Sequence, residues 1–113
     1  MPFPLAVCGA SFIMAGEAMS GMKFYAVFYE VVDDMVNKRV PYREAHLTLL
    51  REAHARGEIV MAGAVGDPPD GALLIFRAPS PEIVEQFVRD DPYVKHGLVV
   101  SWKVKPWTVV AGP

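Results

Sequence analysis

His46 is the side chain in this sequence best suited to chemistry. It lies within residues 41–54, where apolar residues recur at helical spacing, and it falls near the middle of the apolar face that they form. That face comprises Tyr42, Ala45, Leu49, Leu50 and Ala53. An imidazole in such a place needs a partner, because an unpaired polar group among apolar neighbours is costly. His46 is therefore either a paired structural residue or a general acid or base beside a cavity.

Asp91 is the carboxylate that we expect beside His46. It precedes Pro92, which biases its backbone toward an extended conformation, and it follows a predicted helix at the point where the chain turns toward the last strand. A carboxylate within hydrogen-bond reach of an imidazole selects its tautomer and raises its basicity. Such a pair could remove a proton from a carbon next to a carbonyl. Asp91 could equally cap a turn through its own backbone.

Three further residues are candidates for substrate contact. Arg43 lies one helical turn before His46 and could orient a carboxylate or phenolate, although it could also be a surface charge. Tyr93 and Tyr29 are the other two, and we expect them to border the same cleft. Other ionisable residues are more simply explained as strand ends or surface charges: Asp33, Asp34, His54, Asp90 and His96.

The histidine spacing argues against a metal site. No His-x-x-x-His or similar pair would place two ligands on one helix face, and the single cysteine, Cys8, cannot build a cysteine-based zinc cage or an intramolecular disulfide. We therefore expect neither a metal nor a cofactor. The cysteine usage also suits a reducing, cytoplasmic compartment.

Four strands and two helices are predicted to position these side chains. Residues 23–32 are rich in aromatic and β-branched residues and are apolar at almost every position, so we expect a strand with both faces covered. The first helix begins near Pro41 and ends at Gly57. Strands at 58–65 and 72–77 flank a dense turn signal and should form an antiparallel hairpin.

The second half of the chain completes the pattern. Ser80, Pro81 and Glu82 mark the start of a second helix, whose apolar face is Ile83, Val84, Phe87 and Val88. A compact loop reaches Gly97, and residues 98–106 alternate like a half-exposed strand.

The element order βαββαβ predicts an α+β, ferredoxin-like fold with a four-stranded antiparallel sheet and two helices on one face. In a chain this apolar, the face of the sheet without helices should be buried against another surface. We therefore expect a dimer in which two sheets pack face to face, as in a dimeric α+β barrel. Aromatic residues on the flanking strands could line a ligand cleft or fill that dimer core. They are Phe24, Tyr25, Phe28, Tyr29, Trp102 and Trp107.

Composition sets the broad class. The chain has 113 residues, a hydrophobic fraction of 52% and a net charge of −2 without a basic block, so nucleic acid is not an expected partner. No apolar run is long enough to span a membrane. A small-molecule ligand and a homodimer, or a higher oligomer, are the partners that we expect.

Residues 1–21 differ from the rest. They are apolar, rich in Gly, Ala and Met, and carry one charge, Glu17. A secretory signal would place Lys or Arg before its apolar stretch. Two interpretations remain open: a non-native start or expression remnant, with Met22 as the natural beginning, or an arm that packs on a neighbouring subunit. We treat residues 22–113 as the domain.

Residues 22 to about 111 resemble the YciI-like proteins, relatives of the dimeric α+β barrels. The resemblance rests on the opening strand from Met22 and on three spaced motifs. These are Arg43-x-x-His46-Leu47-x-x-Leu50, Gly57-x-x-x-x-Ala62-Gly63 and Asp91-Pro92-Tyr93-x-x-x-Gly97-Leu98. The resemblance implies that His46 and Asp91 form the active-site pair proposed for the family. Members with assigned activity include a dehydrochlorinase of aromatic catabolism.

Together these observations favour an enzyme of lyase, isomerase or dehydrochlorinase type acting on an aromatic or lactone-like molecule. Two alternatives remain. The same cleft could bind a small molecule without converting it, or the barrel could act like a cofactor-independent monooxygenase with an apolar cavity in place of the pair.

Overall fold

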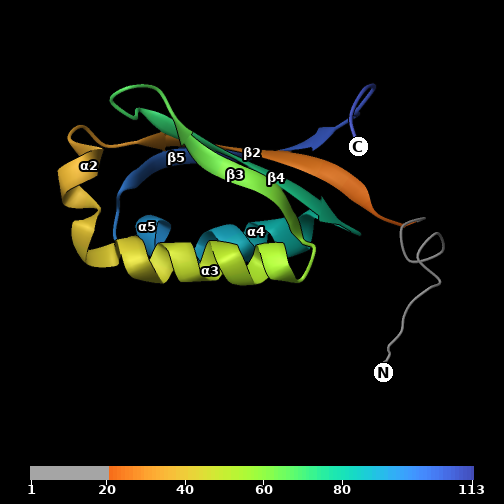
Figure 1. The fold of residues 1–113 in the computed structure, drawn as a ribbon, viewed down its shortest axis with the longest axis horizontal. Helices are drawn as coiled ribbons and strands as arrows, with labels where there is room; N and C mark the ends of the chain where they lie inside the picture. The colour runs from red at the N-terminus through yellow and green to blue at the C-terminus, as the bar shows by residue number, and fades with distance from the viewer. Residues whose placement is uncertain (1–20) are drawn as a thin grey trace.

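The computed structural model describes residues 21–113, and it folds them as one antiparallel sheet with every helix on one side (Figure 1). Residues 1–20 lie outside the described residues, so neither interpretation of the N-terminal extension is tested. The strands are β2 (Lys23–Val31), β3 (Ile59–Val65), β4 (Gly71–Ala78) and β5 (Val99–Trp107). The helices are α2 (Met35–Lys38), the 3-10 turn η1 (Val40–Tyr42), α3 (Arg43–Ala55), α4 (Pro81–Asp90) and α5 (Pro92–Lys95).

The sheet has the strand order β3-β4-β2-β5, and all neighbouring strands are antiparallel. Helix α3 connects β2 to β3 and α4 connects β4 to β5, and neither pair of strands lies side by side in the sheet. The α+β, ferredoxin-like fold predicted from the sequence is therefore confirmed. This is the subunit fold of the dimeric α+β barrels. No helix among residues 21–113 is long and apolar enough to cross a membrane.

The predicted elements begin and end within two residues of the observed ones, but the connections differ. The predicted helix from Pro41 is preceded by α2, and Pro41 itself lies in η1 rather than in α3. The stretch after Asp91, predicted as a loop, contains the short helix α5. A single helical turn escapes periodicity arguments because it is too short to show a repeat. Gly57 ends α3 with φ 81°, a conformation that glycine adopts without strain.

The hydrophobic core lies between the sheet and the helices. Tyr25, Val27 and Tyr29 alternate along β2 and point to this side, where they meet residues of β4 such as Leu74 and Phe76. The buried face of α4 closes the core, with Val84, Phe87 and Val88. Each large apolar side chain buried here contributes about 1.5–3 kcal/mol, so this layer holds α3 and α4 at fixed positions over the sheet.

Two predicted core positions are wrong. Ala45 of α3 and Ile83 of α4 are exposed, because each lies at the margin of its helix's apolar face. The other residues predicted on the apolar face of α3 are confirmed. Ala53 is buried, and Tyr42, Leu49 and Leu50 pack against the core.

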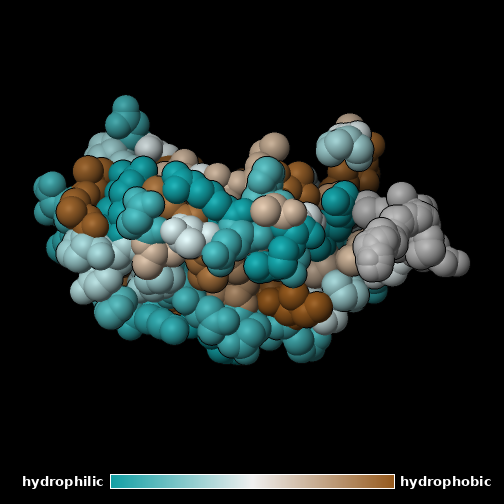
Figure 2. All heavy atoms as spheres, turned by 60° about the horizontal axis from the view of Figure 1, so that its bottom comes forward, coloured by the Kyte–Doolittle hydropathy of each residue, from teal (hydrophilic) through white to brown (hydrophobic). Residues whose placement is uncertain are grey.

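One face of the sheet is not covered by any helix of residues 21–113, and we call it the helix-free face (Figure 1). Phe28, Met61 and Trp107 lie on it and are 44%, 66% and 46% exposed, so the expectation that both faces of β2 are covered does not hold within one chain. The helix-bearing face turned forward in Figure 2 is largely hydrophilic, with separate apolar spots. The six aromatic residues on the flanking strands divide evenly: Tyr25, Tyr29 and Trp102 face the helices, whereas Phe24, Phe28 and Trp107 face away.

Candidate functional site

The structure brings His46 and Asp91 together from distant parts of the chain. His46 lies on α3 and Asp91 separates α4 from α5, and the Nδ1 nitrogen of the ring is 2.8 Å from Oδ1 of the carboxylate. The Asp91 side chain is fully buried, whereas the His46 side chain retains 12% of its exposure. The imidazole is therefore neither sealed in the core nor free in solvent.

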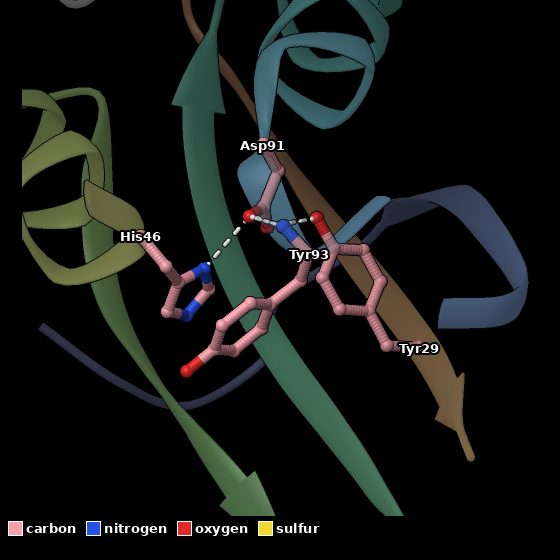
Figure 3. Close-up of polar contacts among 4 residues, drawn as sticks. All are labelled: Tyr29, His46, Asp91 and Tyr93. Carbon is pink, nitrogen blue, oxygen red and sulfur yellow. Dashed lines mark hydrogen bonds and ion pairs between the residues drawn. The ribbon is translucent and has the colours of Figure 1, made fainter. Parts of the chain in front are cut away.

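Three donors converge on the Asp91 carboxylate (Figure 3). The Tyr29 hydroxyl donates to Oδ2 at 2.8 Å, and the backbone N–H of Tyr93 donates to Oδ1 at 3.0 Å. His46 supplies the third contact through Nδ1. Since an ionised carboxylate only accepts, Nδ1 carries a proton in the neutral ring, and the lone pair is left on Nε2.

The local sequence explains how Asp91 performs two tasks. It has extended backbone angles, φ −66° and ψ 123°, as expected for a residue before proline, and its side chain caps α5 by accepting from the N–H of Tyr93. The turn-capping interpretation and the pairing interpretation are therefore both observed, because one carboxylate has enough acceptor sites for the cap, the imidazole and the Tyr29 hydroxyl.

The His46 ring is held from a second side by Tyr93. The two rings stack with centroids 3.7 Å apart and planes 10° from parallel. The Asp91 contact and this stack together fix both the direction and the plane of the imidazole. In Figure 3 the second ring nitrogen of His46 and the hydroxyl of Tyr93 lie on the side away from Asp91.

A cavity of about 280 Å³ lies between α3 and the sheet, and His46 borders it. Tyr29, His46 and Tyr93 border it, together with Arg39 and Arg43. Its remaining walls are mostly small or aliphatic, including Leu47, Leu50, Ala62, Gly63, Ala64 and Ala72. Small side chains on β3 and β4 leave the space that larger ones would fill. The volume is close to the lower end of ligand sites, roughly 300–1,000 Å³.

Both tyrosines at the site remain protonated at neutral pH and above. Burial is the main cause that raises the pKa of Tyr29, and the charge and hydrogen bond of Asp91 add to it. Burial also raises the pKa of Tyr93, while the nearby guanidinium groups of Arg39 and Arg43 oppose that rise. Tyr29 is thus a permanent donor to Asp91.

The other ionisable residues considered from the sequence do not border this cavity. Asp90 is exposed and accepts from Gln86, and His54 lies on a different hollow beside α3. His96 is exposed and stacks on Tyr42. Asp33 and Asp34 lie in the turn before α2, at another hollow. Within residues 21–113, no three His, Cys, Asp or Glu side chains gather as a metal site would require.

Sequence reasoning missed two contributions to the cavity. Arg39 precedes η1 and was not identified as a candidate. The small residues of β3 were identified only as part of a family motif, although Gly and Ala within a strand are a signal of space or of close backbone approach.

The fold and the site define a class: a ferredoxin-like α+β domain with a buried carboxylate–imidazole pair opening on a small cavity between a helix and the sheet. The chain belongs to the YCII-related domain family, whose model matches residues 22–108. It is 30% identical over 95 residues to the protein YciI of Escherichia coli, covering 76% of this chain and 97% of that protein. It is 27% identical over 96 residues to an uncharacterized protein of Haemophilus influenzae, covering 77% and 98%.

Solved structures agree with this assignment. The 5-chloro-2-hydroxyhydroquinone dehydrochlorinase of Burkholderia phenoliruptrix, in complex with 2,5-dihydroxybenzoquinone, is similar with a TM-score of 0.64 and 26% identity, covering 75% of this chain and 93% of that one. A Bacteroides thetaiotaomicron protein, named as a candidate antibiotic biosynthesis monooxygenase, has a TM-score of 0.51 and 10% identity, covering 80% and 90%. The second likeness concerns the fold alone.

Proposed function

We propose that this protein is a small-molecule enzyme of lyase or isomerase type in which His46 is the general acid–base and Asp91 orients it. The observation that carries this proposal is the 2.8 Å contact between a fully buried carboxylate and the Nδ1 nitrogen of a ring that borders a cavity. A paired structural histidine would not need an open cavity against its free side. A monooxygenase-like apolar cavity would not need the carboxylate.

The proposed chemistry is proton transfer at carbon. Nε2 of His46 takes a proton from a carbon next to a carbonyl, and the pair of electrons from the broken C–H bond forms a new double bond. In an isomerase the imidazolium then returns the proton at another position; in a lyase the pair expels a leaving group such as chloride. Asp91 stabilises the imidazolium formed in between. A positioned base of this kind contributes about 10²–10⁴-fold to the rate.

Similarity to the dehydrochlorinase supplies the first substrates to assay. The purified protein is incubated with 5-chloro-2-hydroxyhydroquinone, other chlorinated hydroquinones, catechols and lactones, and chloride release or absorbance change is followed. We expect turnover of one of these aromatic or lactone-like compounds without an added cofactor. His46→Ala and Asp91→Asn should each lower kcat, by about 10²–10⁴-fold for His46→Ala. Normal turnover by both variants would refute the acid–base assignment, and tight binding without conversion would identify a binding protein instead.

We also infer that the protein is a homodimer, paired through the helix-free face of its sheet, and that it acts in the cytoplasm. Phe28, Met61 and Trp107 on that face are large apolar residues with substantial exposure, which a second sheet would cover. Sedimentation analysis should give a dimer, and Phe28→Lys should shift it toward monomer. Val36→Lys is the matched control, because Val36 is equally exposed but lies on α2. A monomeric wild-type protein would contradict this inference.

A further inference from the structure

The hydroxyl of Tyr29 points at the Asp91 carboxylate (Figure 3). It donates its proton to Oδ2 at 2.8 Å, and the residue is only 5% exposed. The ring of Tyr29 borders the cavity, but a phenol has a single proton to donate and this one is already in use. Tyr29 can therefore touch a substrate through its ring, but its proton is not available to one.

The three donors divide the two oxygens of the Asp91 carboxylate between them. Oδ1 accepts from Nδ1 of His46 and from the backbone N–H of Tyr93. Oδ2 accepts from Tyr29, which is its only donor among residues 21–113. Because Asp91 is fully buried, bulk water does not replace a donor that is lost there.

This arrangement bears on where the proton of the pair lies during the proposed reaction. When Nε2 of His46 takes a proton, the ring becomes positive. If the proton on Nδ1 then crossed to Oδ1, both groups would be neutral and Asp91 would no longer stabilise the imidazolium. Hydrogen bonds to the ionised carboxylate oppose that transfer, because they stabilise its charged form. The donor from Tyr29 is permanent, since burial above all, and then the charge and hydrogen bond of Asp91, raise the pKa of Tyr29.

We propose that Tyr29 is a positioning residue of this site, whose hydroxyl keeps the Asp91 carboxylate ionised and fixed in rotation, so that the proton of the pair stays on Nδ1 of His46. This inference rests on the proposed function and deepens it, because it adds a third member to the pair. Strand β2 lies between β4 and β5 in the sheet, and a side chain on such a strand is held more precisely than one on a loop.

The first test needs no substrate. Tyr29→Phe keeps the ring and removes only the hydroxyl. The Nδ1–H proton of His46, identified by its absence from His46→Ala, is observed by NMR of the ¹⁵N-labelled full-length protein at one pH for all variants. In Tyr29→Phe this resonance should move downfield, because a carboxylate with one donor fewer attracts the remaining protons more strongly.

Tyr25→Phe is the matched control. Tyr25 lies on the same face of β2, is 3% exposed and is not one of the three donors to Asp91. Its hydroxyl should therefore be removed without moving the Nδ1–H resonance of His46. An unchanged resonance in Tyr29→Phe, or an equal shift in both variants, would overturn the proposal.

The second test separates a positioning residue from a substrate contact. With a substrate from the proposed screen, Tyr29→Phe should lower kcat by about tenfold and leave KM unchanged, because a hydrogen bond to a charged group is lost where charge develops. Tyr25→Phe should change neither. A raised KM with normal kcat in Tyr29→Phe would show that the hydroxyl binds substrate instead. Failure of the acid–base function shows differently: His46→Ala would turn over substrate normally, while the Nδ1–H resonance still moved in Tyr29→Phe.

Discussion

Two stacked histidine–tyrosine pairs join the same two parts of this molecule, and only one of them belongs to the proposed site. His46 of α3 stacks on Tyr93 of α5, and Tyr42 of η1 stacks on His96 at the end of α5. The ring geometries are similar, with centroids 3.7 and 4.1 Å apart and planes within 14° of parallel. The inner pair contacts a buried carboxylate and borders a cavity, whereas the outer pair does neither.

The comparison shows that ring stacking does not distinguish the proposed base from its counterpart. His46 differs from His96 in its contact with Asp91 and in its place at the cavity. His96 also stacks on a tyrosine, but it lies at the surface. The outer pair is therefore a reference within the same chain for the predictions about His46.

The largest expected effect is on turnover. With a substrate from the proposed screen, His46→Ala should lower kcat by about 10²–10⁴-fold, because the positioned base is lost. His96→Ala should leave kcat unchanged, because His96 lies outside the cavity lining. Both rates are measured at saturating substrate on protein with native circular dichroism. Equal losses in the two variants would show that the stacks act as scaffolding and that neither histidine is the base.

The next effect is on stability, and it separates two adjacent acids. Asp91→Ala should lower the free energy of unfolding by about 3–5 kcal/mol, because it leaves the donors of Tyr29, Tyr93 and His46 buried without an acceptor. Asp90→Ala should change it by less than about 0.5 kcal/mol, because Asp90 is exposed. Urea unfolding at pH 7 measures both. Similar losses would mean that the carboxylate network around Asp91 does not exist in solution.

A smaller effect on the free energy of unfolding is expected when the Tyr29 hydroxyl is removed, and this effect should depend on pH. Tyr29→Phe should lower stability by about 1.5–3 kcal/mol, the usual contribution of a hydrogen bond to a charged group. Because burial and Asp91 raise the pKa of Tyr29 in the native state, the unfolded chain loses this proton first as pH increases. The stabilisation is thus complete below a pH of about 10 and declines above it.

In the wild type the free energy of unfolding should decrease between about pH 9.5 and 11.5. In Tyr29→Phe this decrease should be smaller. The slope is obtained from urea unfolding at a series of pH values. Tyr93, whose pKa burial also raises, keeps its own share of the slope in this variant. An unchanged slope would contradict the raised pKa that burial and Asp91 give Tyr29 in the native state.

The smallest effect is expected at the outer stack. A double-mutant cycle of Tyr42→Ala and His96→Ala should give a coupling energy of no more than about 1 kcal/mol, because a stack in which one ring, His96, is exposed contributes little beyond its buried area. A coupling as large as that between His46 and Asp91, measured by the same cycle, would remove the distinction between the two pairs.

The sequence predicted the fold well because strands and long helices carry their own periodicity. The alternation along residues 98–106 and the helical spacing in residues 81–90 were both visible, and the order of the elements fixed the topology. The helices α2 and α5 escaped because each spans a single turn.

The site was only partly predictable. His46 stood out because a polar residue interrupted an apolar face, and Asp91 because proline followed it. Arg39 was missed because its place at the cavity depends on the path of the chain between β2 and α3, which no local pattern records. The stack of His46 on Tyr93 and the bond from Tyr29 join residues far apart in sequence, and only the packed structure specifies them.

The most direct test is the tautomer of His46, read from ¹⁵N–¹H correlations of the imidazole nitrogens at high pH, where the ring is neutral. A ring held by Asp91 should carry its proton on Nδ1 and leave Nε2 unprotonated, and Asp91→Asn should weaken that preference; His96 provides the solvent-exposed reference in the same spectrum. Protonation of His46 on Nε2, or a mixture of tautomers like that of His96, would contradict the oriented base on which the proposed function rests.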